Sequence, residues 1–303
     1  MTLRCAVAPG AIAPVVADAI TGAGGELVDP DEAEALVWTD ATDARGLADL
    51  LGGLPNVRWV QLPFAGVDRF AGLFDDGRTW TCTKGAYSEA VAEHALALSL
   101  AGLRGLTARA RAREWGDQGG IRLAGAGVTI LGGGGITEAF LRLLAPFGVE
   151  ATVVRRHPAP VPGAAHVVGH EELHDALAGA TLVVLALALV PETAGIIGAG
   201  ELDRMDGNAW LVNVARGGHV VTDDLVAALQ AGAIGGAALD VTDPEPLPAG
   251  HPLWDLDNCL ITPHTANTWQ MAEPLFAERV GANVARYQHH DPLIGLVDPK
   301  LGY

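Results

Sequence analysis

Short apolar segments alternate with amphipathic segments along most of the chain, and this alternation restricts the fold more than any other feature. In the first hundred residues, four segments have the apolar density of strands and two have apolar residues at helical spacing. We expect strands at 4–8, 35–38, 58–62 and 79–83, and helices at 13–22 and 43–51. Strands separated by helices are typical of a small α/β unit.

A second series of the same kind begins at Gly127. Its strands are expected at 128–131, 150–154, 182–187, 210–214, 236–241 and 260–262, with helical segments between most of them. Strands of this apolar density indicate a parallel sheet that is covered by helices on both faces. Longer helical patterns occupy 88–113 and 271–288. The sequence therefore predicts an α/β protein with a doubly wound parallel Rossmann sheet and a second, smaller α/β domain.

Length, charge and cysteine usage narrow the classes of function. A chain of 303 residues has room for two hydrophobic cores, because single cores stop growing near ~250–300 residues. The net charge of −17 opposes binding to nucleic acid and to anionic membranes, and no apolar run reaches the ~18–20 residues of a membrane helix. Cys5, Cys82 and Cys259 lack the paired spacing of a metal site, so we expect buried thiols and no metal. We expect a cytoplasmic protein without a nucleic-acid or membrane partner.

A glycine-rich turn follows the strand expected at 128–131. It reads Gly132-Gly-Gly-Gly-Ile-Thr137 and leads into a helical stretch at 138–144. Glycines in such a turn let the backbone approach a pyrophosphate, which the free N–H groups and the dipole of the helix N-terminus attract. Gly132 and Gly134 occupy the first two positions of the dinucleotide fingerprint, but Thr137 replaces the third glycine. We expect Gly132, Gly134, Gly135 and Ile136 to bind a dinucleotide; an ordinary glycine loop is the alternative.

Arg155 and Arg156 follow the next strand, where an acidic residue would accept a hydrogen bond from the ribose 2′-hydroxyl of NAD. An arginine there can instead pair with the 2′-phosphate of NADP. The sequence therefore favours NADPH over NADH as the cofactor. Two solvated surface arginines are the alternative interpretation.

Polar residues follow three consecutive strands of the second series. Arg216 comes after the strand at 210–214, Glu245 after the strand at 236–241, and His264 after the strand at 260–262. The carboxyl ends of parallel strands share one edge of the sheet, where ligands of open α/β sheets bind. Each residue alone could be a surface arginine, a solvated glutamate or a capping histidine. Together they indicate a catalytic centre of Arg216, Glu245 and His264.

These motifs resemble those of the D-isomer-specific 2-hydroxyacid dehydrogenase family, and the resemblance covers nearly the whole chain. Its most specific parts are Asn213-Val-Ala-Arg-Gly217, Leu239-Asp-Val241 with Glu245-Pro-Leu247, and Pro263-His264. Weaker matches lie at 65–68, 91–94 and 191–193. Departures from the family pattern are Thr137, Arg155, Ala186 and Ala188, all of them beside the expected cofactor.

The resemblance implies an oxidoreductase that transfers a hydride between NAD(P)H and a small, anionic 2-oxo acid to give a D-2-hydroxy acid. Its substrate would be similar to glyoxylate or hydroxypyruvate. In this reaction His264 donates a proton to the developing alkoxide, and Glu245 orients the ring and favours its charged form. Arg216 binds the substrate carboxylate and polarises the carbonyl group.

The resemblance also assigns residues that bind the substrate and the cofactor. Backbone N–H groups of Ala65, Gly66 and Val67 would complete the carboxylate site. Asp240 would hold the nicotinamide amide. His94, within the long helical pattern, is interpreted as a packing or interdomain residue. Further expected cofactor contacts are Thr193, Val214 and Ala215.

The family architecture implies two domains with the active site in a cleft. The substrate-binding domain, of flavodoxin-like α/β type, would combine residues 1–97 with 270–303, and the dinucleotide-binding Rossmann domain would span 98–269. A homodimer through the cofactor domain is the expected assembly. The substrate's side-chain pocket would lie near Phe64, Tyr87 and Trp269.

Three rival interpretations stay open. A formate-type dehydrogenase has the same fold but carries a glutamine where this chain has Glu245. A phosphoglycerate dehydrogenase-type enzyme is a second possibility, although no visibly basic loop favours it. A non-catalytic, nucleotide-sensing protein of the same fold is the third, and the presence of Arg216, Glu245 and His264 argues against it.

Overall fold

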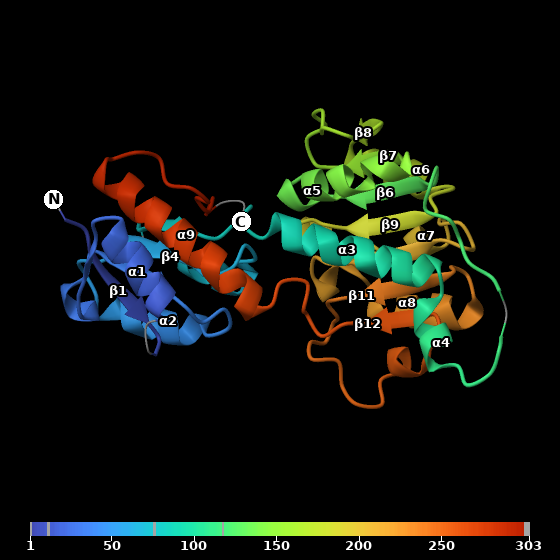
Figure 1. The fold of residues 1–303 in the computed structure, drawn as a ribbon, viewed down its shortest axis with the longest axis horizontal. Coiled ribbons are helices and arrows are strands. Elements are labelled where there is room, and N and C mark those ends of the chain that lie inside the picture. The colour runs from blue at the N-terminus through green and yellow to red at the C-terminus, as the bar shows by residue number, and fades with distance from the viewer. Residues whose placement is uncertain (1, 11–12, 75–76, 117, 300–303) are drawn as a thin grey trace. The chain divides into compact units, whose positions relative to one another are not determined.

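The computed structural model describes residues 2–10, 13–74, 77–116 and 118–299. The chain divides into two compact units: Met1–Tyr87 with Thr268–Tyr303, and Ser88–Asn267 (Figure 1). The first boundary comes earlier than the 97/98 boundary drawn from the sequence. The reason is that the helix beginning at Ser88 buries Ala92 and Ala95 in the core of the larger unit.

The smaller unit is built on a sheet that has five strands within the described ranges, all parallel, in the order β2-β1-β3-β4-β5. The strands are β1 (Arg4–Ala8), β2 (Glu26–Leu27), β3 (Ala35–Trp38), β4 (Trp59–Gln61) and β5 (Thr79–Thr81). This is the flavodoxin-like order, with the first strand second from one edge. The smaller α/β fold expected from the sequence is therefore confirmed.

Helices cover both faces of this smaller sheet. On one face α1 (Pro14–Gly22) lies beside α9 (Trp269–Gln288), so the C-terminal segment completes the core of the N-terminal unit (Figure 1). Their buried side chains include Ile20 and Phe276, which pack on Val37 and Trp59. On the other face, α2 (Ala44–Gly52) buries two leucines against a second apolar cluster.

The larger unit is built on a sheet with seven described strands, also parallel, in the order β12-β11-β10-β9-β6-β7-β8. The strands are β6 (Gly127–Leu131), β7 (Glu150–Val154), β8 (His166–Val168), β9 (Leu182–Leu185), β10 (Trp210–Asn213), β11 (Gly236–Leu239) and β12 (Cys259–Ile261). The chain starts at β6, moves to one edge, and returns to β9 on the other side of β6. This reversal is the topological switch point beside which dinucleotides bind, and the order confirms the doubly wound Rossmann sheet.

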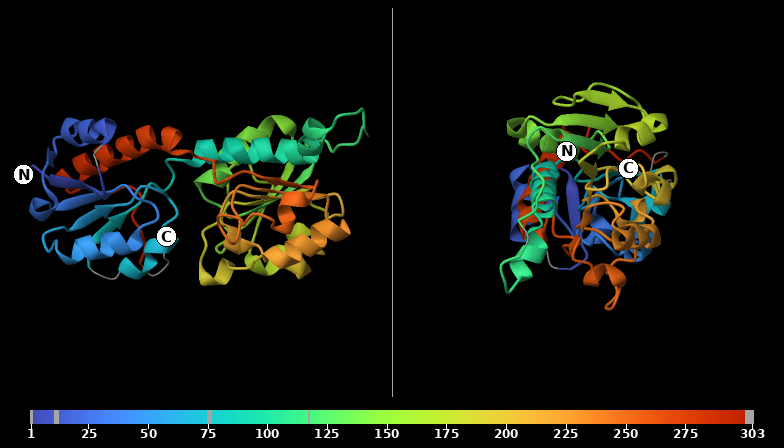
Figure 2. Two further views of the ribbon diagram at one scale, coloured as in Figure 1. Left: turned by 90° about the horizontal axis from the view of Figure 1, so that it is seen from below. Right: turned by 90° about the vertical axis from the view of Figure 1, so that its right-hand side faces the viewer.

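Alternate residues of the larger sheet face opposite apolar cores. Ile130 and its neighbours pack under α3 (Ser88–Leu103) and α5 (Gly135–Leu144), whereas Leu131 packs on the other side. That second side is covered by α6 (Leu173–Leu177), α7 (Ala199–Leu202) and α8 (Thr222–Ala231). Figure 2 shows these two helical layers on opposite sides of the sheet.

Two details of the expected secondary structure were wrong. The single helix predicted at 88–113 is interrupted: α3 ends at Leu103, and α4 (Leu106–Arg111) begins after Gly105, whose left-handed φ of 57° ends the first helix. The short strands β2 and β8 were missed, and β8 directly follows the proline-rich loop that separates it from β7. None of the described helices is both long and apolar enough to cross a membrane.

Candidate active site

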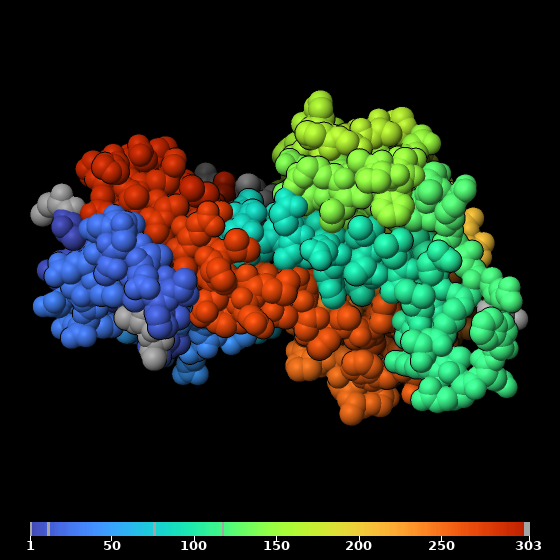
Figure 3. Space-filling model, viewed as in Figure 1, coloured from blue at the N-terminus to red at the C-terminus, as the bar shows by residue number. Residues whose placement is uncertain are grey.

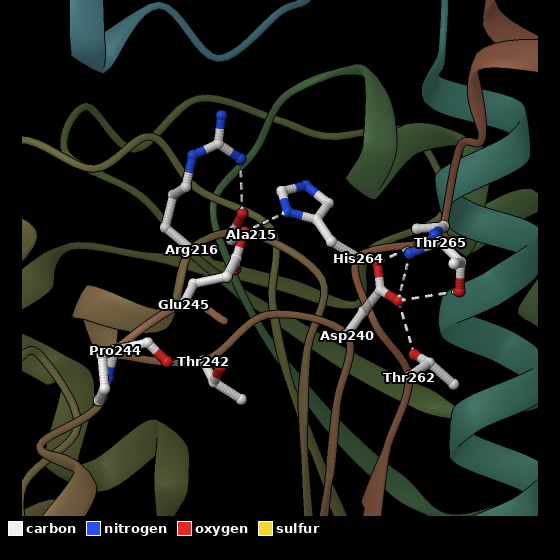
Figure 4. Close-up of polar contacts among 10 residues, drawn as sticks. Ala215, Arg216, Asp240, Thr242, Pro244, Glu245, Thr262, His264 and Thr265 are labelled. Carbon is white, nitrogen blue, oxygen red and sulfur yellow. Dashed lines mark hydrogen bonds and ion pairs between the residues drawn. The ribbon is translucent and has the colours of Figure 1, made fainter. Parts of the chain in front are cut away.

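Three neighbouring strands place the expected catalytic residues on one edge of the larger sheet. β10, β11 and β12 lie side by side and run in the same direction. Arg216 follows β10, Glu245 follows β11, and His264 follows β12. Figure 4 shows the Arg216 guanidinium and the His264 ring extending toward the same side of this edge, with Glu245 in contact with His264.

His264 and Glu245 form the central contact of this site. The Nδ1 atom of His264 lies 2.8 Å from the Oε1 atom of Glu245 (Figure 4). The His264 side chain is 49% exposed and the Glu245 side chain 35%. A ring that is held by a carboxylate on one nitrogen and open on the other can exchange a proton with a bound molecule.

Asp240 holds the backbone around His264. Its Oδ1 atom accepts a hydrogen bond from the Thr265 N–H at 2.8 Å, and its Oδ2 atom accepts one from the Ala266 N–H at 2.9 Å. The His264 N–H donates to the backbone carbonyl of Asp240 at 2.8 Å. His264 itself has a φ of 53°, a left-handed conformation that costs about 1–3 kcal/mol in a non-glycine residue and persists only where the surroundings impose it.

The Asp240 carboxylate is buried but strongly stabilised in its charged form. It accepts further hydrogen bonds from the Thr262 hydroxyl at 2.5 Å and from Nε2 of His94, which lies 3.2 Å away. Burial raises the pKa of Asp240, but the hydrogen bonds from His94, Thr262, Thr265 and Ala266 outweigh burial and lower the pKa to about 2. Asp240 is therefore a carboxylate at neutral pH.

Asn213 and Gly217 shape the turn that carries Arg216. The Asn213 side chain donates to the Arg216 carbonyl at 2.8 Å and accepts from the Ala215 N–H at 3.0 Å, so it spans the turn. Gly217 leaves space for the neighbouring loop, because a Cβ atom there would lie 2.0 Å from the backbone of Thr242. The Arg216 loop and the loop of Glu245 can therefore approach closely. A guanidinium Nη1 of Arg216 donates to the Ala215 carbonyl at 2.8 Å.

The glycine-rich turn between β6 and α5 fits a pyrophosphate. Gly134 is the N-cap of α5, and no side chain caps this N-terminus. A Cβ atom on Gly132 would lie 2.2 Å from the Ala186 carbonyl oxygen, whereas a Cβ on Gly134 would meet nothing within 4 Å. Thr137, which replaces the third glycine, is fully buried and donates its hydroxyl to the Gly132 carbonyl at 2.8 Å. The threonine thus fastens the glycine-rich turn to the first turn of α5.

The two arginines after β7 have different neighbours. The Arg155 side chain lies against Gly133, because a Cβ atom built on that glycine would come within 2.9 Å of Arg155 Cδ. Arg156 forms an exposed ion pair with Glu192, with 3.4 Å between Nη2 and Oε2. Arg155 is therefore the arginine beside the glycine-rich turn.

The remaining expected cofactor residues lie in two segments of the larger unit. Thr193 belongs to a short 3-10 turn after β9 and donates its hydroxyl to the Ala188 carbonyl at 2.8 Å. His219, fully buried, faces the carbonyls of Thr193 at 3.0 Å and Leu187 at 3.2 Å with its two ring nitrogens. Val214 and Ala215 are buried in the turn after β10.

The expected carboxylate-binding backbone lies in the smaller unit. Ala65 and Gly66 are exposed in the loop after β4, and Val67 is buried. The aromatic rings of Tyr87 and Trp269 lie 5.7 Å and 6.0 Å from the ring of Phe64, which precedes this loop.

Sequence reasoning missed several residues that shape the site. His94 was interpreted as a packing residue, and Asn213 and His219 were not assigned a structural task. Asn213 could have been found from its place within the Arg216 motif, since a short polar side chain at a strand end often bonds to the backbone beyond it. Among the described residues, no group of three or more His, Cys, Asp or Glu side chains could hold a metal ion.

Comparisons with known proteins bear on the chemistry of this site. Residues 94–266 match the family model of the D-isomer specific 2-hydroxyacid dehydrogenase NAD binding domain. A glyoxylate/hydroxypyruvate reductase A from Yersinia enterocolitica is 34% identical over 176 residues, which span 58% of this chain and 56% of that protein.

Two crystal structures resemble this one over their full lengths. A D-isomer specific 2-hydroxyacid dehydrogenase from Xanthobacter autotrophicus Py2, in complex with NADPH and MES, has a TM-score of 0.86 and 29% identity, covering 100% of this chain and 99% of its own. An NADPH-dependent glyoxylate/hydroxypyruvate reductase from Sinorhizobium meliloti, in complex with NADP and sulfate, has a TM-score of 0.81 and 27% identity, covering 100% of both chains.

Proposed function

Because the chain belongs to the D-isomer specific 2-hydroxyacid dehydrogenase family, a family of NAD(P)-dependent oxidoreductases, we propose that it reduces a small 2-oxo acid to the corresponding D-2-hydroxy acid. The observation that carries this proposal is the 2.8 Å contact between His264 and Glu245. It lies on the same sheet edge as Arg216, so a proton donor and an anion-binding side chain converge there.

His264 is the proton donor of the proposed reaction. The bound reduced nicotinamide supplies the hydride. Because Nδ1 of His264 faces Glu245, Nε2 is the nitrogen from which a proton passes to the carbonyl oxygen. The Glu245 carboxylate holds the ring in this orientation and stabilises its positive charge until the proton leaves.

Arg216 binds the substrate's carboxylate and polarises its carbonyl group. Its planar guanidinium presents donors in a fixed fork that matches a carboxylate. Asn213 and Gly217 fix the backbone from which this side chain extends. For the backbone N–H groups of Ala65, Gly66 and Val67 we propose a second role in binding the carboxylate.

The proposed substrates are small 2-oxo acids of the glyoxylate and hydroxypyruvate type. The names of the relatives from Yersinia and Sinorhizobium support this choice. The test is a turnover screen of glyoxylate, hydroxypyruvate, pyruvate and bulkier 2-oxo acids with NADPH and NADH. We expect glyoxylate and hydroxypyruvate to give the highest kcat/KM. A preference for bulky acids would contradict the proposed substrate class.

We further propose that the protein prefers NADPH. Arg155 lies against the glycine-rich turn, where a guanidinium can bond to the 2′-phosphate, and two structural neighbours were solved with NADPH or NADP. A charge-assisted hydrogen bond of ~1.5–3 kcal/mol, weakened by solvent, gives a preference of roughly ten-fold or more in kcat/KM.

Arg155→Asp should reverse that preference, because an acid accepts from the 2′-hydroxyl and repels a 2′-phosphate. Arg142→Asp is the matched control: Arg142 is an exposed arginine of the same unit that pairs with Glu89. We expect the control to keep the wild-type ratio. Equal use of both cofactors by the wild type would remove Arg155 from cofactor recognition.

A cytoplasmic homodimer is the proposed state of the protein. Trp115 is 92% exposed, and five arginines against two acids occur within residues 104–122 of a chain whose net charge is −17. Tryptophan and arginine are enriched where proteins associate. The described residues of this segment, 104–116 and 118–122, lie at the surface of the larger unit (Figure 3). Three buried, free thiols support a reducing compartment.

A further inference from the structure

We propose that His94 is a positioning residue for His264 and that it acts through the buried carboxylate of Asp240. The inference rests on the proposed function, because it assigns His94 a task in placing the proton donor. The resemblance described above gave Asp240 a cofactor contact, and that role stays a prediction. The contacts of this carboxylate add a second task, which is to hold the loop of His264.

His94 reaches Asp240 from the helix α3. Its Nε2 atom is 3.2 Å from Asp240 Oδ1 and 3.0 Å from Thr262 Oγ1. The Thr262 hydroxyl donates to Asp240, so its oxygen is free to accept from His94. A single N–H of His94 therefore serves both the carboxylate and the hydroxyl that bonds to it.

The same carboxylate controls the conformation at His264. Its two oxygens accept from the N–H groups of Thr265 and Ala266 (Figure 4). His264 directly precedes Thr265 and donates its own N–H to the Asp240 carbonyl at 2.8 Å. Its φ of 53° is a strained backbone conformation for a histidine. A carboxylate that rotates away would release both N–H groups and let this segment relax.

His94 limits that rotation because the helix that carries it is anchored in the core of the larger unit. α3 buries Ala92 and Ala95 in the core of the larger unit, on either side of His94. The Asp240 side chain is 1% exposed, so water offers it no substitute donor when His94 is removed. Loss of the His94 donor therefore leaves the carboxylate with fewer constraints and the His264 ring less well placed.

The experiment compares His94→Phe, His94→Gln and His174→Phe. Phe removes the donor, whereas Gln keeps an N–H near the position of Nε2. His174 is the matched control, since its Nε2 lies 2.8 Å from Glu201 Oε1 in the same unit, at a place without a role in the reaction. Three quantities are measured: kcat, the Kd for NADPH, and hydrogen exchange of the peptide backbone at 262–266.

We expect His94→Phe to lower kcat by roughly 10- to 100-fold, the size of effect that a small misplacement of a reacting group produces. The Kd for NADPH should stay within about two-fold, and exchange at 262–266 should become faster. His94→Gln should restore most of both properties, and His174→Phe should change neither.

Unchanged exchange at 262–266 in a folded His94→Phe variant would overturn the inference, as would equal losses in the Gln and Phe variants. The exchange measurement needs no turnover. If the wild type reduced no 2-oxo acid, the proposed function would fail while the link from His94 to the His264 loop would still be tested by exchange and by the Gln rescue.

Discussion

At the scale of single residues, the contact of Glu245 with His264 decides which nitrogen of the imidazole can transfer a proton. Glu245 accepts at Nδ1, so the proton that is transferred belongs to Nε2. A neutral imidazole held in this tautomer can also accept a proton at that nitrogen, so the same pair serves oxidation of the hydroxy acid.

Glu245→Gln keeps an oxygen that can accept from Nδ1 but removes the negative charge. We expect kcat to drop by about 10-fold or more, because a neutral amide holds the imidazole less firmly than a carboxylate does. Measurements of kcat and of the Kd for NADPH in both proteins check this. An unchanged kcat would mean that the contact with Glu245 does not matter for proton transfer.

Asp240 makes a pH-dependent contribution to stability. Its pKa is about 2 against an ordinary value of 3.8, so the stabilisation is present above about pH 4 and is lost as the pH falls through about 2. The shift corresponds to about 2 kcal/mol of unfolding free energy. The difference between wild type and Asp240→Asn, measured by denaturant titration, should shrink by this amount over that pH range; a constant difference would contradict it.

The sequence predicts which residues of the site carry its chemistry, but it does not predict all of the contacts among them. Arg216, Glu245 and His264 each follow an apolar strand, so parallel pairing brings them to one edge, and the structure places them there. The contact of His94 with Asp240 could not be predicted, because it depends on how α3 packs on β10 and β11. No local pattern encodes that packing.

At the scale of elements, the site depends on the close approach of the loops that carry Arg216 and Glu245. At their point of contact Gly217 has no side chain to keep them apart. Gly217→Ala would place a Cβ atom 2.0 Å from the Thr242 backbone and force the loops of Arg216 and Glu245 apart. We expect a loss of about 1–3 kcal/mol in unfolding free energy, together with a lower kcat.

Gly218→Ala is the control for this substitution. There the added Cβ would lie 3.3 Å from the Cδ2 atom of Leu189, the end of a flexible side chain that can move. Denaturant titration and kcat measurements of both variants check the prediction. If Gly217→Ala were as stable and active as Gly218→Ala, the close approach of the two loops would not matter.

The order of most helices and strands could be predicted from the sequence, but two short strands and the end of one helix could not. The density of apolar residues predicts the buried strands, since a strand that is covered on both faces contains few polar residues. β2 and β8 lie at the edges of their sheets, where so few residues pair that no periodic signal develops. The break after α3 depends on the positive φ of Gly105, within a run of good helix formers.

At the scale of the whole molecule, the exposed segment around Trp115 should be part of a dimer interface. The proposal predicts a dimer in solution, and Trp115→Ser should weaken it enough to shift the mass measured by light scattering toward the monomer. Trp254→Ser is the control, since Trp254 is 45% exposed and bonds within its own loop. A wild type that is monomeric at all accessible concentrations would contradict the proposed assembly.

The most direct test of the whole account is the oxidation of NADPH by wild type and His264→Gln with glyoxylate and hydroxypyruvate. The wild type should consume NADPH in step with the 2-oxo acid and release the D-2-hydroxy acid. His264→Gln should lower kcat by about 10²–10⁴-fold while the Kd for NADPH stays near its wild-type value. Undiminished turnover in this variant would contradict the assignment of His264 as proton donor, and NADPH binding without any turnover by the wild type would make the protein a nucleotide sensor.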